Sequence, residues 1–322
     1  MAKEIKVTQF FEQHSPQIES LSPFIEKTSF HADEGTGALY VAKLYPGVLA
    51  EVIDFDINGM EVPAIEADGF LTLNYCFSGQ YEMRTPNDRY FYVKAGLLNV
   101  DMTPPAGRTI YTVGKYAGLE ITINYTELQQ NPPASWKEFG IDFSELMTLL
   151  ATSNGSYLAQ STPEWNRMAS ELAGHITHGN LPIEDYRFQL LQLLWAIKTE
   201  KKLSTIFRPT FLTAGQRAVV LRTEALMTKD LRKRYVITDL ATDEGVSAAT
   251  LKSHFALVFG KPISSYLKER RIEKAKELLI TGKMSIEEIS NTVGYENQAK
   301  FAAMFREETG VSPTEYRRLN RI

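Results

Sequence analysis

The stretch VGYENQAKFAAMFREETGVSPTEYRR, Val293 to Arg318, decides the fold of the end of this chain because it repeats an earlier segment, ITDLATDEGVSAATLKSHFALVFGKPISSYL. At an offset of 49 residues the matched positions are Ile237, Leu240 and Gly245 with Ile286, Ile289 and Gly294. At an offset of 50 they are Leu251, Phe255, Gly260 and Tyr266 with Phe301, Phe305, Gly310 and Tyr316. Each copy has the pattern of a short helix, a turn at glycine and a longer helix. The repeat therefore predicts two helix-turn-helix units.

Local signals in the second copy agree with this prediction. The apolar residues of its first helix recur three and four positions apart, as one helix face requires, at Ile286, Ile289 and Val293. Ser285 and Glu288 have the spacing of a capping box at its start, and Gly294 can end it in the left-handed conformation. The next helix ends at Gly310, and Pro313 suits the first turn of the helix after it.

The second helix of each unit carries short or hydrogen-bonding side chains between its apolar positions. These outward positions are Ala249, Thr250, Lys252, Ser253, Gln298, Ala299, Lys300, Ala303 and Arg306. Such a face can enter a DNA major groove, where lysine reaches guanine, Gln298 reaches adenine and Arg306 contacts phosphate. The plain alternative, a solvated helix face, holds for most single helices, but the tandem repeat favours DNA contact.

The segment between the two units has a length that suits DNA. Residues 262 to 281 are rich in strong helix formers. At roughly 1.5 Å per residue they span about 30 Å, close to the roughly 34 Å between successive major grooves.

Residues from about 212 to 320 resemble the DNA-binding domain of the AraC/XylS family of bacterial transcriptional regulators. The resemblance rests on YLKERRIEKAKELL in the connecting helix and on SIEEISNTVGYENQAKFAAMFREETGVSPTEYRR in the second unit. It implies that the nine outward positions include the base-contacting residues of two recognition helices. Two positions depart from the usual pattern: Ser290 stands where alanine is common, and Ala303 where many members carry a polar residue.

Charge is distributed unevenly along the chain. From Phe207 onward there are 20 Lys and Arg against 14 Asp and Glu, a net of +6, which leaves 15 against 25, a net of -10, for residues 1 to 206. Phosphate contacts supply much of a protein's affinity for DNA. The basic half is therefore the half expected to bind the duplex.

The first part of the chain, residues 1 to 141, is expected to form an antiparallel β domain. Short strand-like runs follow one another from about Gly37 to Tyr125, separated by Asn58-Gly59, Asp68-Gly69 and Ser78-Gly79. One such run alternates an apolar face, Leu71, Leu73, Tyr75 and Phe77, with Thr72, Asn74, Cys76 and Ser78. The family resemblance implies a cupin-like jelly roll that senses an effector, so the expected fold class is α+β.

The residue pattern does not favour an enzyme, a metal centre or a cofactor. None of the five histidines lies between residues 37 and 125, and His175 and His178, three apart on a predicted helix, have no third ligand nearby. The single cysteine, Cys76, is expected to pack as a small apolar residue. No apolar run approaches a membrane span and the N-terminus lacks a signal-peptide core, so we expect a cytoplasmic protein.

A small-molecule pocket is the favoured hypothesis for the β domain. The candidate lining residues are Tyr75, Phe77, Tyr81 and Tyr92, with Arg84 as a partner for an acidic ligand. Aromatic residues at strand spacing are more often plain core, and one sequence does not fix which face points inward.

Residues 142 to 204 are expected to form a helical dimerisation or linker segment, followed by the DNA-binding domain from 205 to 322. The run PIEDYRFQLLQLLWAIKTEKK is apolar over more than one face, so it either packs on the β domain or pairs with a second subunit. A hinge is expected in Thr199 to Thr210. The resulting hypothesis is a dimeric transcriptional regulator that binds double-stranded DNA under control of an effector, with RNA polymerase as a further partner. The alternatives are a cupin-type metal enzyme fused to a DNA-binding module and a nonspecific architectural protein.

Overall fold

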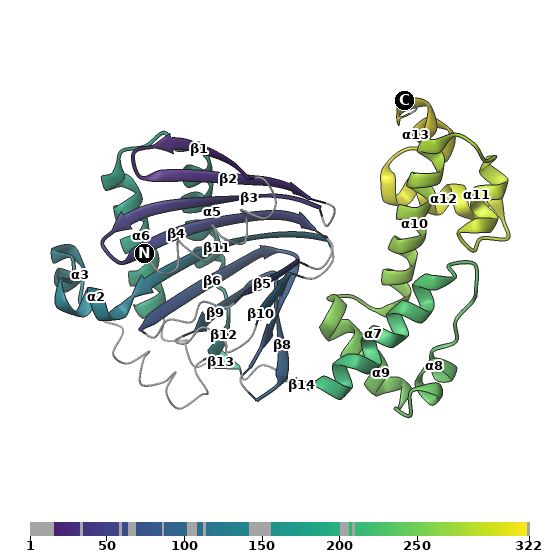
Figure 1. The fold of residues 1–322 in the computed structure, drawn as a ribbon, viewed down its shortest axis with the longest axis horizontal. Helices are drawn as coiled ribbons and strands as arrows, with labels where there is room; N and C mark the ends of the chain where they lie inside the picture. Colours follow the sequence, from purple (N-terminus) through teal and green to yellow (C-terminus); the bar gives the residue numbers. More distant parts are fainter. Residues whose placement is uncertain are drawn as a thin grey trace. The chain divides into compact units, whose positions relative to one another are not determined.

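The protein, seen in a computed structural model, divides into two compact units, residues 1–211 and 212–322 (Figure 1). The structure describes residues 16–32, 35–57, 60–63, 69–85, 87–101, 108–111, 114–141, 156–199, 206–207 and 210–320. Within these ranges, no helix has both the length and the apolar character needed to cross a membrane.

The first unit is built on two antiparallel sheets. Its strands are β1 (Gln17–Ser22), β2 (Ile25–Ala32), β3 (Gly35–Tyr45), β4 (Val48–Ile57), β5 (Met60–Pro63), β6 (Phe70–Ser78), β7 (Gln80–Arg84), β8 (Arg89–Lys94), β9 (Leu97–Asp101), β10 (Arg108–Tyr111), β11 (Gly114–Asn124), β12 (Ser156–Gln160) and β13 (Ile206–Phe207). The large sheet has the order β1-β2-β3-β4-β11-β6-β9-β12-β13, and the other contains β8-β7-β10-β5.

The strand pairing is that of a jelly roll. Strand β4 pairs with β11, β5 with β10, β6 with β9 and β7 with β8, so the first four strands pair in reverse order with the next four. Alternate pairs fall into opposite sheets, which is the double Greek-key winding of this fold. The expected jelly roll is confirmed, and its large sheet is extended by β1, β2 and β3 on one side and by β12 and β13 on the other.

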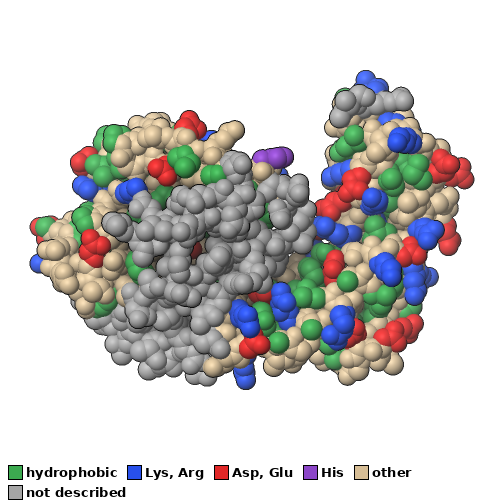
Figure 2. Space-filling view, in the orientation of Figure 1, with side chains coloured by type: hydrophobic (Ala, Val, Ile, Leu, Met, Phe, Trp, Pro, Cys, Tyr) green, Lys and Arg blue, Asp and Glu red, His purple; other side chains and the backbone are tan. Residues whose placement is uncertain are grey.

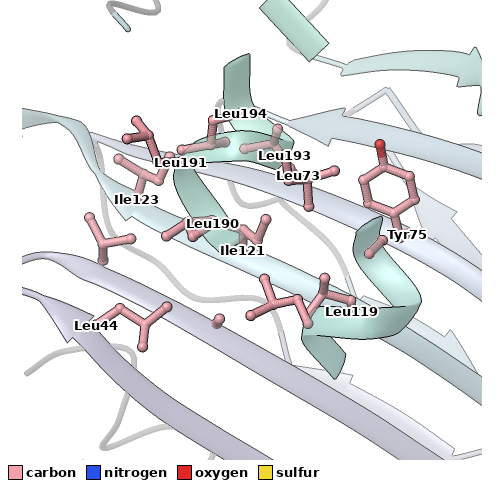
Figure 3. Packing of buried hydrophobic residues seen from close by; sticks show 14 of the residues in the cluster. Leu44, Leu73, Tyr75, Leu119, Ile121, Ile123, Leu190, Leu191, Leu193 and Leu194 are labelled. Atoms are coloured by element: carbon pink, nitrogen blue, oxygen red, sulfur yellow. The ribbon is translucent and has the colours of Figure 1, made fainter. Parts of the chain in front are cut away.

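Two helices cover the outer face of the large sheet. Among the described residues, the helices of this unit are α2 (Tyr125–Gln130), α3 (Ala134–Glu138), α5 (Pro163–His178) and α6 (Ile183–Thr199). Leu190, Leu193 and Leu194 of α6 are buried in one apolar cluster with side chains of β6 and β11 (Figure 3). The apolar run of α6 thus packs on the β domain, one of the two arrangements expected from the sequence. The run FSELMTLLA, residues 143 to 151, lies outside the described residues.

A second apolar cluster fills part of the space between the sheets. It joins Ile53 and Phe55 of β4 to Met83 of β7 and to Phe91 and Val93 of β8. The turn glycine Gly79 has φ +75°, and a Cβ there would lie 2.0 Å from the Lys115 carbonyl oxygen. Glycine is therefore required at the β6–β7 turn, as Ser78-Gly79 predicted.

The second unit is helical. Its elements are β14 (Leu212–Thr213), α7 (Ala214–Lys229), α8 (Ile237–Asp243), α9 (Ala248–Phe259), α10 (Ile263–Thr281), α11 (Ile286–Thr292), α12 (Gln298–Thr309) and α13 (Pro313–Asn320). Helices α8 and α9 form one helix-turn-helix, α11 and α12 form the other, and α10 joins them (Figure 1). Both predicted units are present.

Candidate nucleic-acid interface

Helix α10 belongs to both helix-turn-helix units. Its first turn buries Ile263 and Tyr266, and the ring of Tyr266 contacts Phe255 and Phe259 of α9. Its second half places Ile272, Ala275 and Leu279 in one cluster with α11 and α12. Because one continuous helix contributes to both cores, the helix itself sets the spacing of the two units. Its 19 residues give a length of about 28 Å at 1.5 Å per residue.

Side-chain caps fix where the two candidate recognition helices begin. Ser247 Oγ accepts a hydrogen bond from the Thr250 N–H at 3.0 Å, and Asn297 Oδ1 accepts one from the Lys300 N–H at 3.0 Å. Gly260 and Gly310 end α9 and α12 in the left-handed conformation. Each cap satisfies backbone groups that the helix leaves without partners. The two helices therefore have equal lengths of 12 residues.

The supporting helix α11 begins at the predicted capping box. Ser285 Oγ accepts from the Glu288 N–H at 3.1 Å, and Glu288 Oε2 accepts from the Ser285 N–H at 2.7 Å. The second bond lowers the pKa of Glu288, because it stabilises the charged carboxylate. A similar capping box, Thr213 with Gln216, begins α7.

The structure leaves the predicted outward positions open. Exposed side chains are Ala249, Lys252, Ser253, Gln298, Ala299, Lys300, Ala303 and Arg306, whereas Thr250 is half-buried. On the opposite side of each helix the positions Leu251, Phe255, Phe301 and Phe305 are buried. All nine candidate positions are thus brought to the solvent side of α9 and α12.

The cations on the two exposed faces differ in charge pairing from several other cations of the unit. Some of those others are held by carboxylates, as in Arg222 with Glu244 at 2.5 Å and Lys268 with Glu308 at 2.6 Å. By contrast, Lys252, Lys300 and Arg306 make no ion pair with any residue that the structure describes. Figure 2 shows Lys and Arg side chains along the visible face of this unit, interspersed with Asp and Glu. The two helix faces therefore present cations that are free to meet phosphate or base edges.

The five candidate pocket residues do not converge. Tyr75 and Phe77 belong to the helix-covered face of the large sheet, whereas Tyr81 lies between the sheets. Arg84 is an exposed residue bound to Asp88 at 2.6 Å, and the Tyr92 hydroxyl donates to Glu82 at 2.5 Å. Side chains alternate across a strand, so residues of β6 and β7 chosen for aromatic character alone fall on different faces.

The groups considered for metal binding or reactivity have ordinary roles. His175 Nδ1 bonds Gln189 Oε1 at 2.8 Å and His178 Nδ1 bonds the Gly174 carbonyl at 2.6 Å. Across the described ranges, His, Cys, Asp and Glu form no group of three that could hold a metal ion. Burial raises the pKa of the Cys76 thiol to about 12, which suits a packing role.

Sequence reasoning missed a set of polar residues on the inner face of the jelly roll. Buried there are Glu51, Asn74, Asn99, Asp101 and Thr122. The signal was present in β6, where Thr72 and Asn74 alternate with the apolar face, but that face was not assigned to the interior.

The family comparison falls within the helical unit. Residues 240–319 match a family model described as a helix-turn-helix domain. The virulence regulon transcriptional activator VirF of Yersinia enterocolitica is 27% identical over 181 residues, 56% of this chain and 65% of VirF. The HTH-type transcriptional activator RhaR of Shigella dysenteriae is 24% identical over 177 residues, 52% of this chain and 61% of RhaR. Each match thus spans less than two thirds of the relative's length.

Among solved structures, the C-terminal domain of AraT, a response regulator from Geobacillus stearothermophilus, is 31% identical. The match covers 32% of this chain and 87% of the AraT domain, with a TM-score of 0.31.

Proposed function

Because residues 240–319 make this chain a member of the AraC family through its helix-turn-helix domain, we propose that it is a sequence-specific DNA-binding transcriptional regulator. The proposal assigns one recognition helix to each unit, α9 in the first and α12 in the second. The relatives VirF and RhaR are named as transcriptional activators, which supports a role in transcription.

The observation that carries the proposal is the pair of exposed helix faces. Lys252 lies two residues after Thr250, whose N–H donates to the N-cap of α9, and the N–H of Lys300 itself donates to the N-cap of α12. Both lysines are exposed, and neither has a carboxylate partner among the described residues. Lysine can donate to the guanine O6 and N7 atoms in the major groove, and each good base contact contributes about 1–3 kcal/mol of discrimination. Gln298 on α12 can pair with adenine in the same groove.

The spacing of the helices supports binding to one side of the duplex. The α10 length of about 28 Å approaches the roughly 34 Å between successive major grooves. Two recognition helices joined by it can enter neighbouring grooves, so the site should contain two short blocks about ten base pairs apart.

Selection of random DNA duplexes by the full-length protein tests this function. The expected result is a motif of two blocks at one fixed spacing. Enrichment without any motif, with binding that simply falls as salt rises, would show a nonspecific clamp and contradict the proposal.

We also propose that the jelly roll binds a small-molecule effector that controls the DNA-binding unit. A ligand acts in this way only if it binds one arrangement of the protein better than another. The two-unit organisation supports this, because a sensing unit and a binding unit can then change their relation. A ligand that demonstrably binds but leaves DNA affinity and transcription unchanged would contradict the coupling.

Self-association through α6 is the third part of the proposal. Phe188 and Trp195 lie seven residues apart on the outward side of α6, and their side chains are 57% and 47% exposed. Large exposed aromatic residues on one helix face favour an interface, here with a second copy of the chain. Sedimentation of the wild type should show a dimer at micromolar concentration, and Trp195→Glu should shift it to monomer. A monomeric wild type would contradict self-association through α6.

A further inference from the structure

The loop between α7 and α8, residues 230–236, contacts the second helix-turn-helix (Figure 1). We call it the bridging loop. Gly294, in the turn between α11 and α12, has φ +85°, and a Cβ there would overlap the Leu231 carbonyl oxygen and lie 3.1 Å from Arg232 Cα. The loop backbone therefore packs directly on the turn that precedes α12. Among residues 212–320, none of α7, α8 and α9 packs broadly on α11, α12 or α13.

Arg271, near the middle of α10, holds the bridging loop from the side of the helix. Its Nε donates to the Leu231 carbonyl at 3.0 Å, and its Nη2 donates to the Lys233 carbonyl at 3.2 Å. The same guanidinium lies over the ring of Tyr295, 5.6 Å from its centroid. Tyr295 belongs to the turn before α12, and its ring lies 6.0 Å from that of Phe301 on α12, centroid to centroid. One side chain thus joins the bridging loop to the second helix-turn-helix.

Hydrogen bonds within the bridging loop tie it to the first helix-turn-helix. Tyr235 Oη donates to the Leu226 carbonyl of α7 at 2.9 Å and lies 3.1 Å from the Asp230 carbonyl oxygen. The Arg232 N–H donates to Asp230 Oδ1 at 3.1 Å, and the Lys233 N–H donates to the Asp230 carbonyl at 3.3 Å. Because the loop is held to α7 and leads directly into α8, a contact that fixes the loop also fixes these helices.

The middle of α10 belongs to neither helix-turn-helix core. Ile263 and Tyr266 are buried at its start, and the next buried residue is Ile272, which lies in the core of the second helix-turn-helix. Residues 267–271 between them are half-buried. Long helices curve gently, so a small bend over these residues would move α9 relative to α12. The Arg271 contacts give the first helix-turn-helix a second attachment, away from the helix axis, and two attachments resist the bending that one helix allows.

We propose that Arg271 is a positioning residue, which fixes the separation of the two DNA blocks by bracing the bridging loop against the second helix-turn-helix. The inference rests on the proposed two-block function and names the residue that keeps the block spacing fixed. One additional base pair between the blocks moves the second block by about 3.4 Å along the duplex and turns it by about 35° around the axis. A braced pair of recognition helices cannot follow this change, whereas an unbraced pair can.

Binding of the full-length protein to a set of duplexes tests the brace. One duplex carries both selected blocks at the selected spacing, others have one base pair inserted or removed between the blocks, and one has a single block scrambled. Insertion should lower the affinity of the wild type about tenfold or more, because the contacts of one block are lost. Arg271→Ala should bind the selected duplex more weakly, since it is less preorganised. Insertion should cost this variant less than about threefold, as for two flexibly linked modules.

Two control variants separate the brace from lost charge and from lost stability. Arg271→Lys keeps the positive charge but lacks the planar fork that holds two carbonyls at once, so it should still tolerate the insertion better than the wild type. Thr213→Ala removes the capping box at the far end of α7 and destabilises the same unit without touching the bridging loop. It should keep the sensitivity of the wild type to spacing.

A measurement without DNA tests the same inference independently. Spin labels are attached at Ser253→Cys on α9 and Ala303→Cys on α12, two exposed positions, while the native Cys76 is buried. The distribution of distances between the labels should be narrow with Arg271 in place and broader in the Arg271→Ala variant. Equal widths would overturn the proposal, whatever the protein does with DNA.

An Arg271→Ala protein that remains as sensitive to spacing as the wild type would also overturn the proposal. So would an equal loss of affinity for every duplex, restored by Arg271→Lys and accompanied by a salt dependence reduced by about one phosphate contact, because Arg271 would then bind the duplex itself. A wild type that selects no motif contradicts the regulator function instead, and the label distances still decide the brace. A protein that selects two blocks but fails these tests keeps its function and loses only the role of Arg271.

Discussion

The rings of Phe305 and Tyr316 meet edge-to-face, with their centroids 5.4 Å apart. Fifty positions earlier, the rings of Phe255 and Tyr266 meet edge-to-face with the same centroid distance of 5.4 Å. The two pairs occupy matched places in the two helix-turn-helix units. Each joins the buried face of a recognition helix to the helix that follows it. The sequence repeat is therefore also a repeat of core geometry.

The two tyrosines differ in one contact, and this difference predicts unequal effects. Tyr266 Oη donates to Glu224 Oε1 of α7 at 2.8 Å. Tyr266→Phe should therefore lower the free energy of unfolding by about 1 kcal/mol. Tyr316→Phe is the matched control and should change it less, since no described residue bonds the Tyr316 hydroxyl. Chemical denaturation of both variants measures the difference, and equal effects would contradict it.

The Tyr75 hydroxyl predicts a stabilising substitution. Tyr75 is 1% exposed in the apolar layer beneath α5 and α6 (Figure 3), and no residue that the structure describes forms a hydrogen bond with its Oη. Tyr75→Phe should raise the free energy of unfolding by about 1 kcal/mol, because it removes an unsatisfied buried hydroxyl.

Tyr186 lies in the same apolar layer, and its substitution by Phe is the control for which the free energy of unfolding should change in the opposite direction. Its hydroxyl donates to the His175 carbonyl at 3.1 Å and accepts from the Leu181 N–H at 3.3 Å. Tyr186→Phe should destabilise the protein by a similar amount. If both substitutions lowered stability equally, the Tyr75 hydroxyl would have a partner in solution.

Removal of the helix caps should loosen the recognition helices one at a time. Ser247→Ala and Asn297→Ala each delete the side-chain acceptor at the start of α9 or α12. Each should lower the free energy of unfolding by about 1 kcal/mol. Hydrogen exchange should then rise in the first turn of the affected helix only. If one substitution raised exchange equally in both helices, the prediction that each cap stabilises only its own helix would be wrong.

The Glu288 capping box predicts a pH dependence. The Ser285 backbone N–H lowers the pKa of Glu288 below its ordinary value of 4.5. A carboxylate with a lowered folded-state pKa stabilises the fold above the unfolded-state pKa, and this contribution is lost as pH falls through the lowered value. Glu288→Gln should therefore weaken the dependence of melting temperature on pH below about 4.5, the ordinary glutamate range. Glu287→Gln, one residue away, is the control and should retain the wild-type dependence.

The C-terminal unit was predictable because its signals are local. The capping box at Ser285, the left-handed glycine at Gly310 and the helix start at Pro313 all act within a few residues, and the structure has each of them. The repeat supplied the tertiary relation as well, since matched residues such as Phe255 and Phe305 had to occupy matched sites.

The buried polar residues on the inner face of the jelly roll were not predictable in the same way, because they come from four strands. Glu51 and Glu120 are 69 positions apart and meet only through the β4–β11 register. A bulge between Ala117 and Gly118 further shifts the alternation in β11. Sequence alternation shows that a strand has two faces, but the fold decides which face is enclosed. Aromatic character therefore pointed to Tyr75 and Phe77 on the outer face.

The assignment of one block of DNA sequence to each recognition helix is tested most directly by repeating the duplex selection with Lys252→Ala and Lys300→Ala. Lys274→Ala is the control, because Lys274 is paired with Glu277 on α10, away from both faces. The account predicts that Lys252→Ala relaxes one block, that Lys300→Ala relaxes the other, and that the control selects the wild-type motif. Variants that both retain the full two-block motif, or that lose affinity equally for all sequences, would show that α9 and α12 do not read bases through these lysines.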